Sequence, residues 1–570
     1  MLKRSRTALR AAVTAAVVGA GVLVAATPAV AAPTRAYLVI TAPNDTAGAK
    51  SAVAGNSGTV WASYDAIGVV VAHSGATDFA SRMRTVSGVQ KVGATRTSDI
   101  PAEAANAPIP AAPSQAAPAT SEPLRSDMTQ IGADKAWAVN TGSANVTVGV
   151  LDTGVDDLHD DLKDNFDAAN SASCAYGKLD TRAGSWRDTD THGTHVAGTI
   201  AAAKNGRGVV GVAPGVKIAS VRIAEKPSGL FFAENTICAM VFSGDRGFEV
   251  TNNSYYTDPW LFNCPDNADQ DAILEGVKRA VAYAEGKGVL NVAAAGNENY
   301  NLAAKTRDTT SPNDSTPAQR NITNSCLSVP TEVSGVVSVA SITSGNGKSS
   351  FSNYGTDKIH IAAPGDSVYS TVPGGRYGSK SGTSMASPHV AGVAALLKSV
   401  NPTATPAQLR TLLATQADDL SCTDSRCSGT TAKNNFFGEG RADALAAVDT
   451  GTPPPGGKTF ENTADVAIPD AGAAVTSSIT VTGVDGNAPA TLKVGVDIVH
   501  TYRGDLVVDL IAPDGTAYRL QNSSNDGADN IVQTFTVNAS SEVANGTWKL
   551  QVQDVARVDV GNINSWKLTF

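Results

Sequence analysis

One short stretch limits the possible folds of this chain more than any other. Residues 381–389 read SGTSMASPH and run directly into residues 390–397, whose small apolar side chains predict a buried helix. Ser384 therefore falls at or near the first helical turn, where backbone N–H groups lack partners and the helix dipole favours negative charge. A serine held there can attack a carbonyl carbon and have the oxyanion stabilised. A lone serine beside a helix start is more often a simple N-cap, so the catalytic interpretation depends on the rest of the chain.

Short apolar runs alternate with helical segments between residues 126 and 448. The runs are residues 146–151, 216–223, 289–295, 336–342 and 359–363, and the clearest helical segments are residues 193–203 and 269–287. Strands that alternate with helices predict an α/β domain with a mostly parallel sheet flanked by helices.

Three polar residues stand where these expected elements meet loops. Asp152 follows the run at residues 146–151, His192 precedes a helical segment, and Asn297 follows another run. We expect His192 to take the proton of Ser384 and Asp152 to fix the imidazole tautomer. Asn297 is expected to donate to the oxyanion together with the Ser384 N–H. Taken singly, Asp152 is explained equally well by a turn, His192 by a core histidine and Asn297 by a C-cap. Together the three residues favour nucleophilic catalysis. The second histidine, His195, is assigned to packing.

These motifs resemble those of the subtilisin-like serine proteases. The matching strings lie at residues 150–154, 192–198, 294–297 and 382–389, with further matches at residues 211–214 and 362–365. The resemblance covers residues 126–448 and implies a secreted serine endopeptidase, monomeric, acting on proteins or peptides with broad specificity. It implies the roles of orienting residue for Asp152, base and acid for His192, nucleophile for Ser384 and oxyanion donor for Asn297.

The same resemblance implies a substrate-binding set. Its members are Ser254, Tyr255, Tyr256, Ala294 and Gly296. Tyr256 stands where the family commonly has a glycine, which predicts a narrowed S1 pocket. Glu298 and Asp258 lie nearby in the sequence and are acidic. A selective, kexin-like protease that cuts after basic residues is therefore an alternative. A binding protein on an inactive protease scaffold is a further alternative, and the intact catalytic residues argue against it.

A calcium site is also implied. Asp161 and Asn205 match two side-chain ligands of the family's tight calcium site, and hard oxygen ligands suit this ion. Lys204, beside Asn205, departs from the family pattern. We expect structural calcium at Asp161 and Asn205.

The N-terminal residues predict export. Four basic residues precede the apolar run at residues 11–26, and a small-x-small cleavage signal follows at residues 29–31. This pattern predicts a signal peptide at residues 1–31, cleaved after Ala31, because the run is short for a membrane span. The protein is therefore expected to be extracellular and to have no membrane span.

A small folded unit and a linker follow this segment. Residues 35–40 and 66–72 read as strands and residues 79–92 as a helix, which predicts a small α+β unit at residues 32–100. Residues 101–125 are rich in Ala and Pro and predict an exposed linker, a natural site for proteolysis. The resemblance implies that residues 32–100 are an inhibitory propeptide, which acts as chaperone and intramolecular inhibitor until the linker is cut.

The C-terminal part has a different periodicity. After a Pro/Gly linker at residues 449–457, apolar residues alternate at residues 492–498, 506–510, 548–552 and 566–570. This period of two predicts an antiparallel β-sandwich over residues 458–570. The strings at residues 500–506 and 561–566 resemble the P domain of kexin-like convertases.

Charge and cysteine content narrow the possible partners. There are 44 Lys and Arg against 53 Asp and Glu, a net charge of −9 with no basic stripe, so we expect no nucleic-acid partner. Six cysteines fit an oxidising compartment. Cys422 and Cys427 are expected to pair locally, and the other four allow three pairings among which the sequence does not choose.

Overall fold

A computed structural model of the protein describes residues 33–422, 424–448, 458–484, 486–489 and 492–570. The expected signal peptide at residues 1–31 and the expected linker at residues 449–457 lie outside these residues. Within the described ranges, no helix combines the length and apolar character needed to cross a bilayer.

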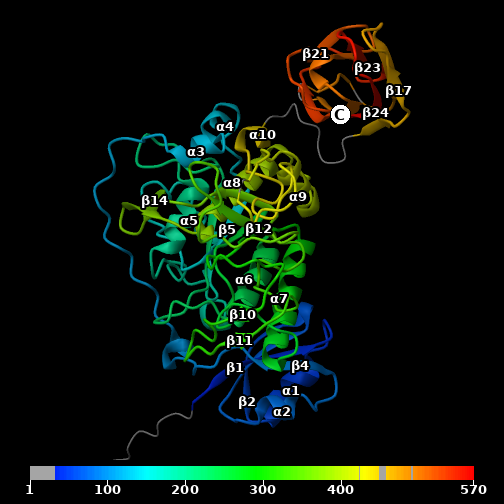
Figure 1. Ribbon diagram of the computed structural model, residues 1–570. Helices are drawn as coiled ribbons and strands as arrows, with labels where there is room; N and C mark the ends of the chain where they lie inside the picture. Colours follow the sequence, from blue (N-terminus) through cyan, green and yellow to red (C-terminus); the bar gives the residue numbers. More distant parts are fainter. Residues whose placement is uncertain (1–32, 423, 449–457, 485, 490–491) are drawn as a thin grey trace, which may run out of the picture. The chain divides into compact units, whose positions relative to one another are not determined.

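A seven-stranded parallel sheet organises the part of the chain that carries the candidate catalytic residues (Figure 1). In sheet order the strands are β13 (Ile361–Pro364), β12 (Val337–Ile342), β9 (Leu290–Ala294), β8 (Val250–Asn253), β5 (Thr147–Asp152), β7 (Lys217–Arg222) and β6 (Ala172–Ser173). All neighbouring strands pair in parallel. Each apolar run that predicted a strand overlaps one of them, because strands buried on both faces read as continuous apolar segments. The predicted α/β class is confirmed.

Helices cover both faces of this sheet. On one face, α5 (His192–Ala201), α8 (Thr383–Val400) and α9 (Pro406–Thr415) share a core with the sheet, and on the other α6 (Ala233–Arg246) and α7 (Ala268–Gly286) do so. The centre of α8 is made of Ala, Gly, Val and Leu, and it is buried along most of its length. Since parallel strands point their carboxyl ends to one edge, the loops that follow β5, β8 and β9 gather at that edge.

Shorter elements complete this part of the chain. They are α3 (Ser126–Gln130), α4 (Ala133–Val139), α10 (Ala444–Val448), the pair β10 (Arg307–Asp308) and β11 (Arg320–Asn321), and the hairpin of β14 (Val368–Val372) and β15 (Arg376–Lys380).

The N-terminal unit is a four-stranded antiparallel sheet in the order β2-β3-β1-β4. Its elements are β1 (Arg35–Thr41), α1 (Ala47–Gly55), β2 (Gly58–Tyr64), β3 (Val69–Ser74), α2 (Phe79–Met83) and β4 (Val89–Ala94). The prediction of one helix over residues 79–92 was wrong beyond Met83. The helix α2 already ends at Met83, and Gly88, at φ +84°, forms part of the turn that leads into β4, which pairs with β1.

Both faces of this N-terminal sheet are apolar, and each has its own partner. Tyr37 and Val39 of β1 point to a core with α1 and α2. Leu38 and Ile40 point the other way, into the core that contains α6 and α7. The side chains of β1 alternate between the two faces of the N-terminal sheet, so one set packs against the helices that flank the parallel sheet.

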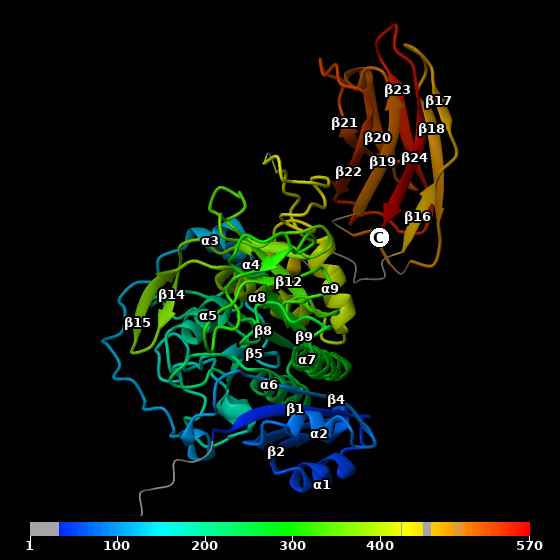
Figure 2. The same ribbon diagram turned by 60° about the horizontal axis from the view of Figure 1, so that its bottom comes forward.

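The C-terminal part, described by itself, is a sandwich of two antiparallel sheets (Figure 2). One sheet has the order β16-β24-β19-β22 with β17 paired to β24, and the other the order β18-β23-β20-β21. The strands are β16 (Thr459–Asn462), β17 (Val466–Ile468), β18 (Val475–Val481), β19 (Leu492–His500), β20 (Leu506–Ile511), β21 (Ala517–Gln521), β22 (Ile531–Val537), β23 (Gly546–Asp554) and β24 (Gly561–Thr569). Trp548 and Trp566 are fully buried between the sheets, and the Trp566 Nε1 donates to Ser477 Oγ at 2.9 Å. The predicted sandwich is confirmed.

Three disulfides lie within the described residues. Cys422 pairs with Cys427, as the sequence predicts, and the pairs that the sequence left open are Cys174–Cys238 and Cys264–Cys326. Cys174–Cys238 ties the end of β6 to α6.

Candidate active site

Asp152 and His192 form the first half of the site. Asp152 ends β5, is fully buried, and its Oδ1 accepts from the Thr153 N–H at 2.7 Å and lies 2.8 Å from His192 Nδ1. Gly193, the next residue of α5, allows this approach, because a Cβ there would lie 2.1 Å from the Gly154 carbonyl oxygen. The start of α5 can therefore pack directly against the turn that carries Asp152.

The surroundings of His192 favour its protonated form. Burial alone would lower the pKa of His192, but the charge of Asp152 and its hydrogen bond outweigh burial and raise the pKa above its usual value. His195, one turn along α5, behaves in the opposite way: burial lowers its pKa to about 3, and its Nε2 lies 3.0 Å from the Val368 carbonyl oxygen. This pattern makes His192 the histidine suited to accept a proton and His195 a neutral packing residue.

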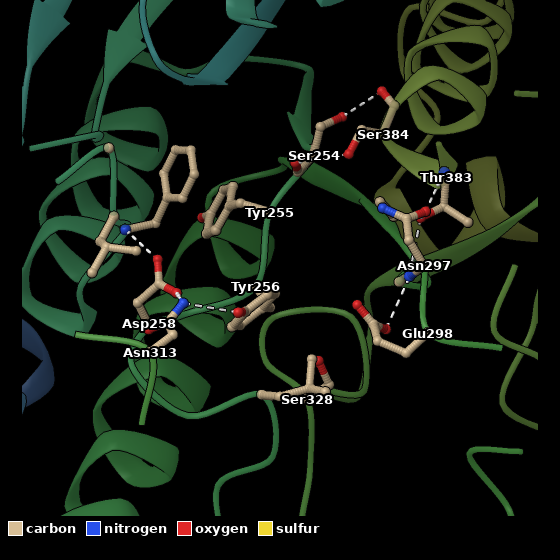
Figure 3. A pocket seen from close by; sticks show the side chains of 16 residues that line it. Ser254, Tyr255, Tyr256, Asp258, Asn297, Glu298, Asn313, Ser328, Thr383 and Ser384 are labelled. Atoms are coloured by element: carbon tan, nitrogen blue, oxygen red, sulfur yellow. Dashed lines mark hydrogen bonds between the residues drawn. The ribbon is translucent and has the colours of Figure 1, made fainter. Parts of the chain in front are cut away.

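Ser384 lies in the first turn of α8 and is held by Ser254 (Figure 3). The Ser384 Oγ donates to the Ser254 carbonyl at 3.2 Å, and the Ser254 Oγ donates to the Ser384 carbonyl at 2.9 Å. The Ser384 carbonyl is available because Pro388, four residues on, has no N–H to donate to it.

The Ser384 hydroxyl and His192 are not joined by a hydrogen bond in the described structure, since the hydroxyl turns to Ser254. Such nucleophile–base contacts are often long or misaligned without substrate. The structure thus brings Asp152 to His192, and Ser384 to Ser254.

Asn297, which follows β9, is oriented by the start of α8. Its Oδ1 accepts from the Thr383 N–H at 2.8 Å and from the Thr383 Oγ1 at 2.9 Å. An amide whose oxygen is fixed in this way turns its NH₂ group to the other side. A Cβ built on Gly382 would lie 3.6 Å from Asn297 Nδ2, Asn297 Oδ1 and Ser384 N, so both N–H donors lie near one point. These two donors therefore border one space, as an oxyanion-binding pair requires.

A cavity of about 270 Å³ opens beside Ser384, and its lining includes the whole predicted substrate-binding set (Figure 3). These lining residues are Ser254, Tyr255, Tyr256, Ala294 and Gly296.

Polar groups that line this cavity come from a loop as well as from the predicted segment. Asn313 Nδ2 donates to the Tyr256 hydroxyl at 2.9 Å and to Asp258 Oδ1 at 2.7 Å. Asp258 is only 3% exposed, and burial raises its pKa to about 7. Sequence reasoning missed Asn313, which sits in a loop with no periodic pattern. Glu298 instead turns back, since its Oε2 accepts from Asn297 N and Asn353 Nδ2 at 2.9 Å.

A second cavity, of about 570 Å³, lies on the His192 side. Its lining includes Asp190 and Glu225, and it shares Gly229, Phe231 and Ser254 with the first cavity. The two cavities therefore meet at Ser254. Glu225 was not predicted, because no motif or periodic pattern marks it.

Asp161 and Asn205, the expected calcium ligands, lie together. Asp161 is buried, and its Oδ2 accepts from Val209 N and from the Tyr377 hydroxyl, both at 2.9 Å. Its Oδ1 lies 3.3 Å from Asn205 Nδ2, and burial raises the pKa of Asp161. Lys204 points away, with its Nζ 5.8 Å from the Trp137 ring centre.

The carboxylate oxygens near the Asn205 loop are of the type that a hard cation prefers, and here they accept hydrogen bonds from N–H and O–H groups. Glu122 Oε1 accepts from the N–H groups of Asn205 and Gly206, which adds a second carboxylate beside the loop. Among the described residues Asp161 forms no ion pair, and no group of three or more His, Cys, Asp or Glu is arranged to hold a metal. A cation here would depend on amide and carbonyl oxygens beside the two carboxylates, as calcium does.

A parallel α/β sheet with a serine at a helix start and a histidine–aspartate pair at its carboxyl edge is the architecture of a subtilisin-like serine protease. Comparison with known proteins agrees: residues 143–440 match the subtilase family model, and residues 489–570 match the proprotein convertase P-domain. The chain belongs to the subtilase family.

Individual relatives are similar over different parts of the chain. The extracellular basic protease of Dichelobacter nodosus is 32% identical over 504 residues, which cover 77% of this chain and 75% of that protein. Subtilisin DY of Bacillus licheniformis is 35% identical over 51% of this chain and 90% of its own length. Leupeptin-inactivating enzyme 1 of Streptomyces exfoliatus is 61% identical over 154 residues, but this chain spans only 35% of that protein.

A solved structure supports the fold. The epidermin leader peptide processing serine protease of Staphylococcus aureus aligns with a TM-score of 0.58 and 21% identity, covering 74% of this chain and 99% of that one.

Proposed function

We propose that the protein is a secreted serine endopeptidase that cleaves peptide bonds in proteins through Asp152, His192 and Ser384. The observation that carries the proposal is the 2.8 Å contact between Asp152 Oδ1 and His192 Nδ1, at the same sheet edge as Ser384 in a chain of the subtilase family. An inactive scaffold would not need to keep this pair and the Asn297 amide together.

The reaction proceeds through an acyl-enzyme. His192 Nε2 takes the Ser384 hydroxyl proton as Oγ attacks the substrate carbonyl carbon, and Asp152 holds the opposite Nδ1–H. Asn297 Nδ2 and the Ser384 N–H donate to the oxyanion. His192 then gives the proton to the leaving amine, and a water molecule activated by His192 hydrolyses the ester to regenerate Ser384.

Substrate specificity is proposed to be broad. The aromatic and aliphatic side chains of Phe231, Tyr255 and Leu261 in the cavity beside Ser384 suit large apolar residues. The kexin-like alternative depends on Asp258 rather than Glu298, because Glu298 is turned back toward Asn297 and Asn353.

Residues 32–100 are proposed to be an inhibitory propeptide and chaperone that the enzyme removes itself. The apolar face that β1 shares with α6 and α7 supports this role. The cut is proposed to fall in the linker at residues 101–125 and before Glu122, because Glu122 holds the Asn205 loop and the buried Arg125 donates to Val210 O and Tyr369 O.

Secretion, calcium and the P domain complete the proposal. The sequence of residues 1–31 and the extracellular designation of the Dichelobacter relative support export. Calcium bound by Asp161 and Asn205, with Glu122 nearby, would neutralise a buried carboxylate and stiffen the loop. Residues 458–570 are proposed to be a P domain that stabilises the enzyme or binds its targets, and the enzyme is proposed to act as a monomer.

Cleavage-site profiling tests the proposed function. The secreted protein and its Ser384→Ala variant are incubated with a mixed peptide library, and the products are sequenced by mass spectrometry. Scattered cuts after large or apolar residues, absent with the variant, are expected. Cuts confined to paired Lys and Arg would favour the kexin-like alternative, and identical products from both samples would refute the catalytic assignment.

A further inference from the structure

Arg96 enters a buried acidic pocket formed by another part of the chain. It follows β4 and is 3% exposed. Its Nη1 and Nη2 donate to Glu225 Oε2 and Oε1 at 2.9 and 2.7 Å, and Nη2 also contacts Glu234 Oε1. The guanidinium carbon lies 3.8 Å from the centre of the Phe232 ring. Two carboxylates and an aromatic face thus surround one arginine head group, an arrangement that suits a guanidinium better than an ammonium.

This pocket has more capacity for hydrogen bonds than Arg96 uses. Glu225 and Glu234 are each 1% exposed, and only one positive charge lies between them. Within the described residues Glu234 Oε2 is buried and has no hydrogen-bond partner. Buried carboxylates without a cation are costly, so removing Arg96 would leave a site with a strong demand for a positive charge.

Two ion pairs between the N-terminal unit and α7 are more exposed than the Arg96 contact. Lys91–Asp271 and Arg84–Asp269 leave between 27 and 45% of each side chain exposed. Exposed pairs of this kind contribute little to binding energy. Among these ion pairs, the Arg96 contact is therefore the one that is buried.

The pocket borders the candidate active site. Glu225 also lines the cavity that contains His192, and Phe231, next to Phe232, lines both cavities. Once residues before Glu122 are cut away, an extended peptide in these cavities can place a side chain where Arg96 lies now.

We propose that Glu225, Glu234 and Phe232 form a binding site for an arginine side chain, filled by Arg96 in the intact chain and by an arginine of the substrate after processing. The inference rests on the proposed function, and it adds an arginine preference at one fixed distance from the cut bond. It places this preference in a pocket distinct from the lining of the cavity beside Ser384, which contains Asp258.

The test uses enzyme that has matured from the full chain. Peptides with one constant large apolar residue before the cut bond carry arginine, in turn, at each earlier position, and a matched series carries citrulline there. Citrulline keeps the shape of arginine and removes its charge. At one position the arginine peptide should be cleaved with a kcat/KM about tenfold or more above that of its citrulline partner, since charged hydrogen bonds are strong in buried sites.

Two variants locate the effect. Glu225→Gln and Glu234→Gln should reduce the arginine-to-citrulline ratio toward one, whereas Asp271→Asn, which removes an exposed carboxylate at the same N-terminal contact, should keep it. If the glutamine variants do not mature, the ratio of the unaltered enzyme decides. Equal cleavage of the two series at every position would overturn the inference alone, while no cleavage of any peptide would contradict the proposed function itself.

Discussion

Asn297 uses the two ends of its amide for different purposes. Its oxygen accepts from the Thr383 N–H, one of the donors at the start of α8 that lack an intrahelical partner. Its nitrogen lies near the same point beside Gly382 as the Ser384 N–H. One side chain therefore orders the helix start and completes the candidate oxyanion site.

Asn297→Ala should lower kcat far more than it raises KM. Removal of an oxyanion donor costs roughly 100- to 1000-fold in turnover, a magnitude known for such an amide in the subtilisin family. Steady-state kinetics on one peptide checks this, and thermal unfolding of the variant reports the lost helix contact separately. An unchanged kcat would remove Asn297 from the mechanism.

Asp258 should make the substrate preference of the cavity beside Ser384 depend on pH. Burial raises its pKa to about 7, so the carboxyl is largely neutral below this pH and negatively charged above it. The ratio of kcat/KM for a peptide with lysine before the cut bond to that for its phenylalanine analogue should therefore rise as the pH passes through 7.

The ratio cancels the titration of His192, which affects both peptides equally. In Asp258→Asn the ratio should be flat over the same pH range. A ratio that rises equally in the variant would show that another group recognises the lysine.

At the scale of elements, α8 is adapted to the nucleophile that it carries. Pro388 removes one intrahelical hydrogen bond, and the freed Ser384 carbonyl accepts from the Ser254 Oγ instead. This exchange links the start of α8 to the segment after β8, which lines the substrate cavity.

A double-mutant cycle measures this link. Ser254→Ala should lower the free energy of unfolding by about 1 kcal/mol, because the Ser384 carbonyl loses its partner. In the background of Pro388→Ala, where residue 388 regains an N–H, the same change should cost measurably less. Denaturant unfolding of the four proteins gives the coupling, and equal costs in both backgrounds would contradict this role of Pro388.

The sequence predicts five of the seven strands of the parallel sheet, because strands buried on both faces read as apolar runs. The strands β8 and β6 are short and partly polar, and they were not among the predicted runs. The helical prediction for residues 79–92 was wrong beyond Met83, because residues 89–94 form β4 and pair with the distant strand β1, a long-range contact that local spacing does not reveal. Asn313, Glu225 and the two long-range disulfides lie in contacts between distant segments, for which a single sequence carries no local signal. The roles of Asp152, His192, Ser384 and Asn297 stay predictions, now with a geometry that favours them.

At the scale of the whole molecule, the N-terminal sheet and the helices α6 and α7 share one apolar core. Ile40 is fully buried there. A sheet with two apolar faces is incomplete on its own, so its second face favours formation of the surface on which it packs.

Ile40→Asp should therefore reduce the yield of processed enzyme strongly, since it places a charge in this core. Thr59→Asp, on the exposed part of β2, is the matched control and should mature normally. The amount of processed protein in the medium over time measures both. Normal maturation of Ile40→Asp would argue against a chaperone role for residues 32–100.

The central claim is that Ser384 is the nucleophile activated by His192, and covalent labelling tests it most directly. The matured enzyme is treated with an aryl sulfonyl fluoride. A nucleophilic serine oxygen attacks the sulfur atom of this reagent and fluoride leaves, and the resulting adduct is located by peptide mass spectrometry. The account predicts one adduct, on Ser384, formed in step with loss of peptidase activity and strongly slowed in His192→Ala. An inactivating adduct on another residue, or full activity after complete labelling of Ser384, would contradict it.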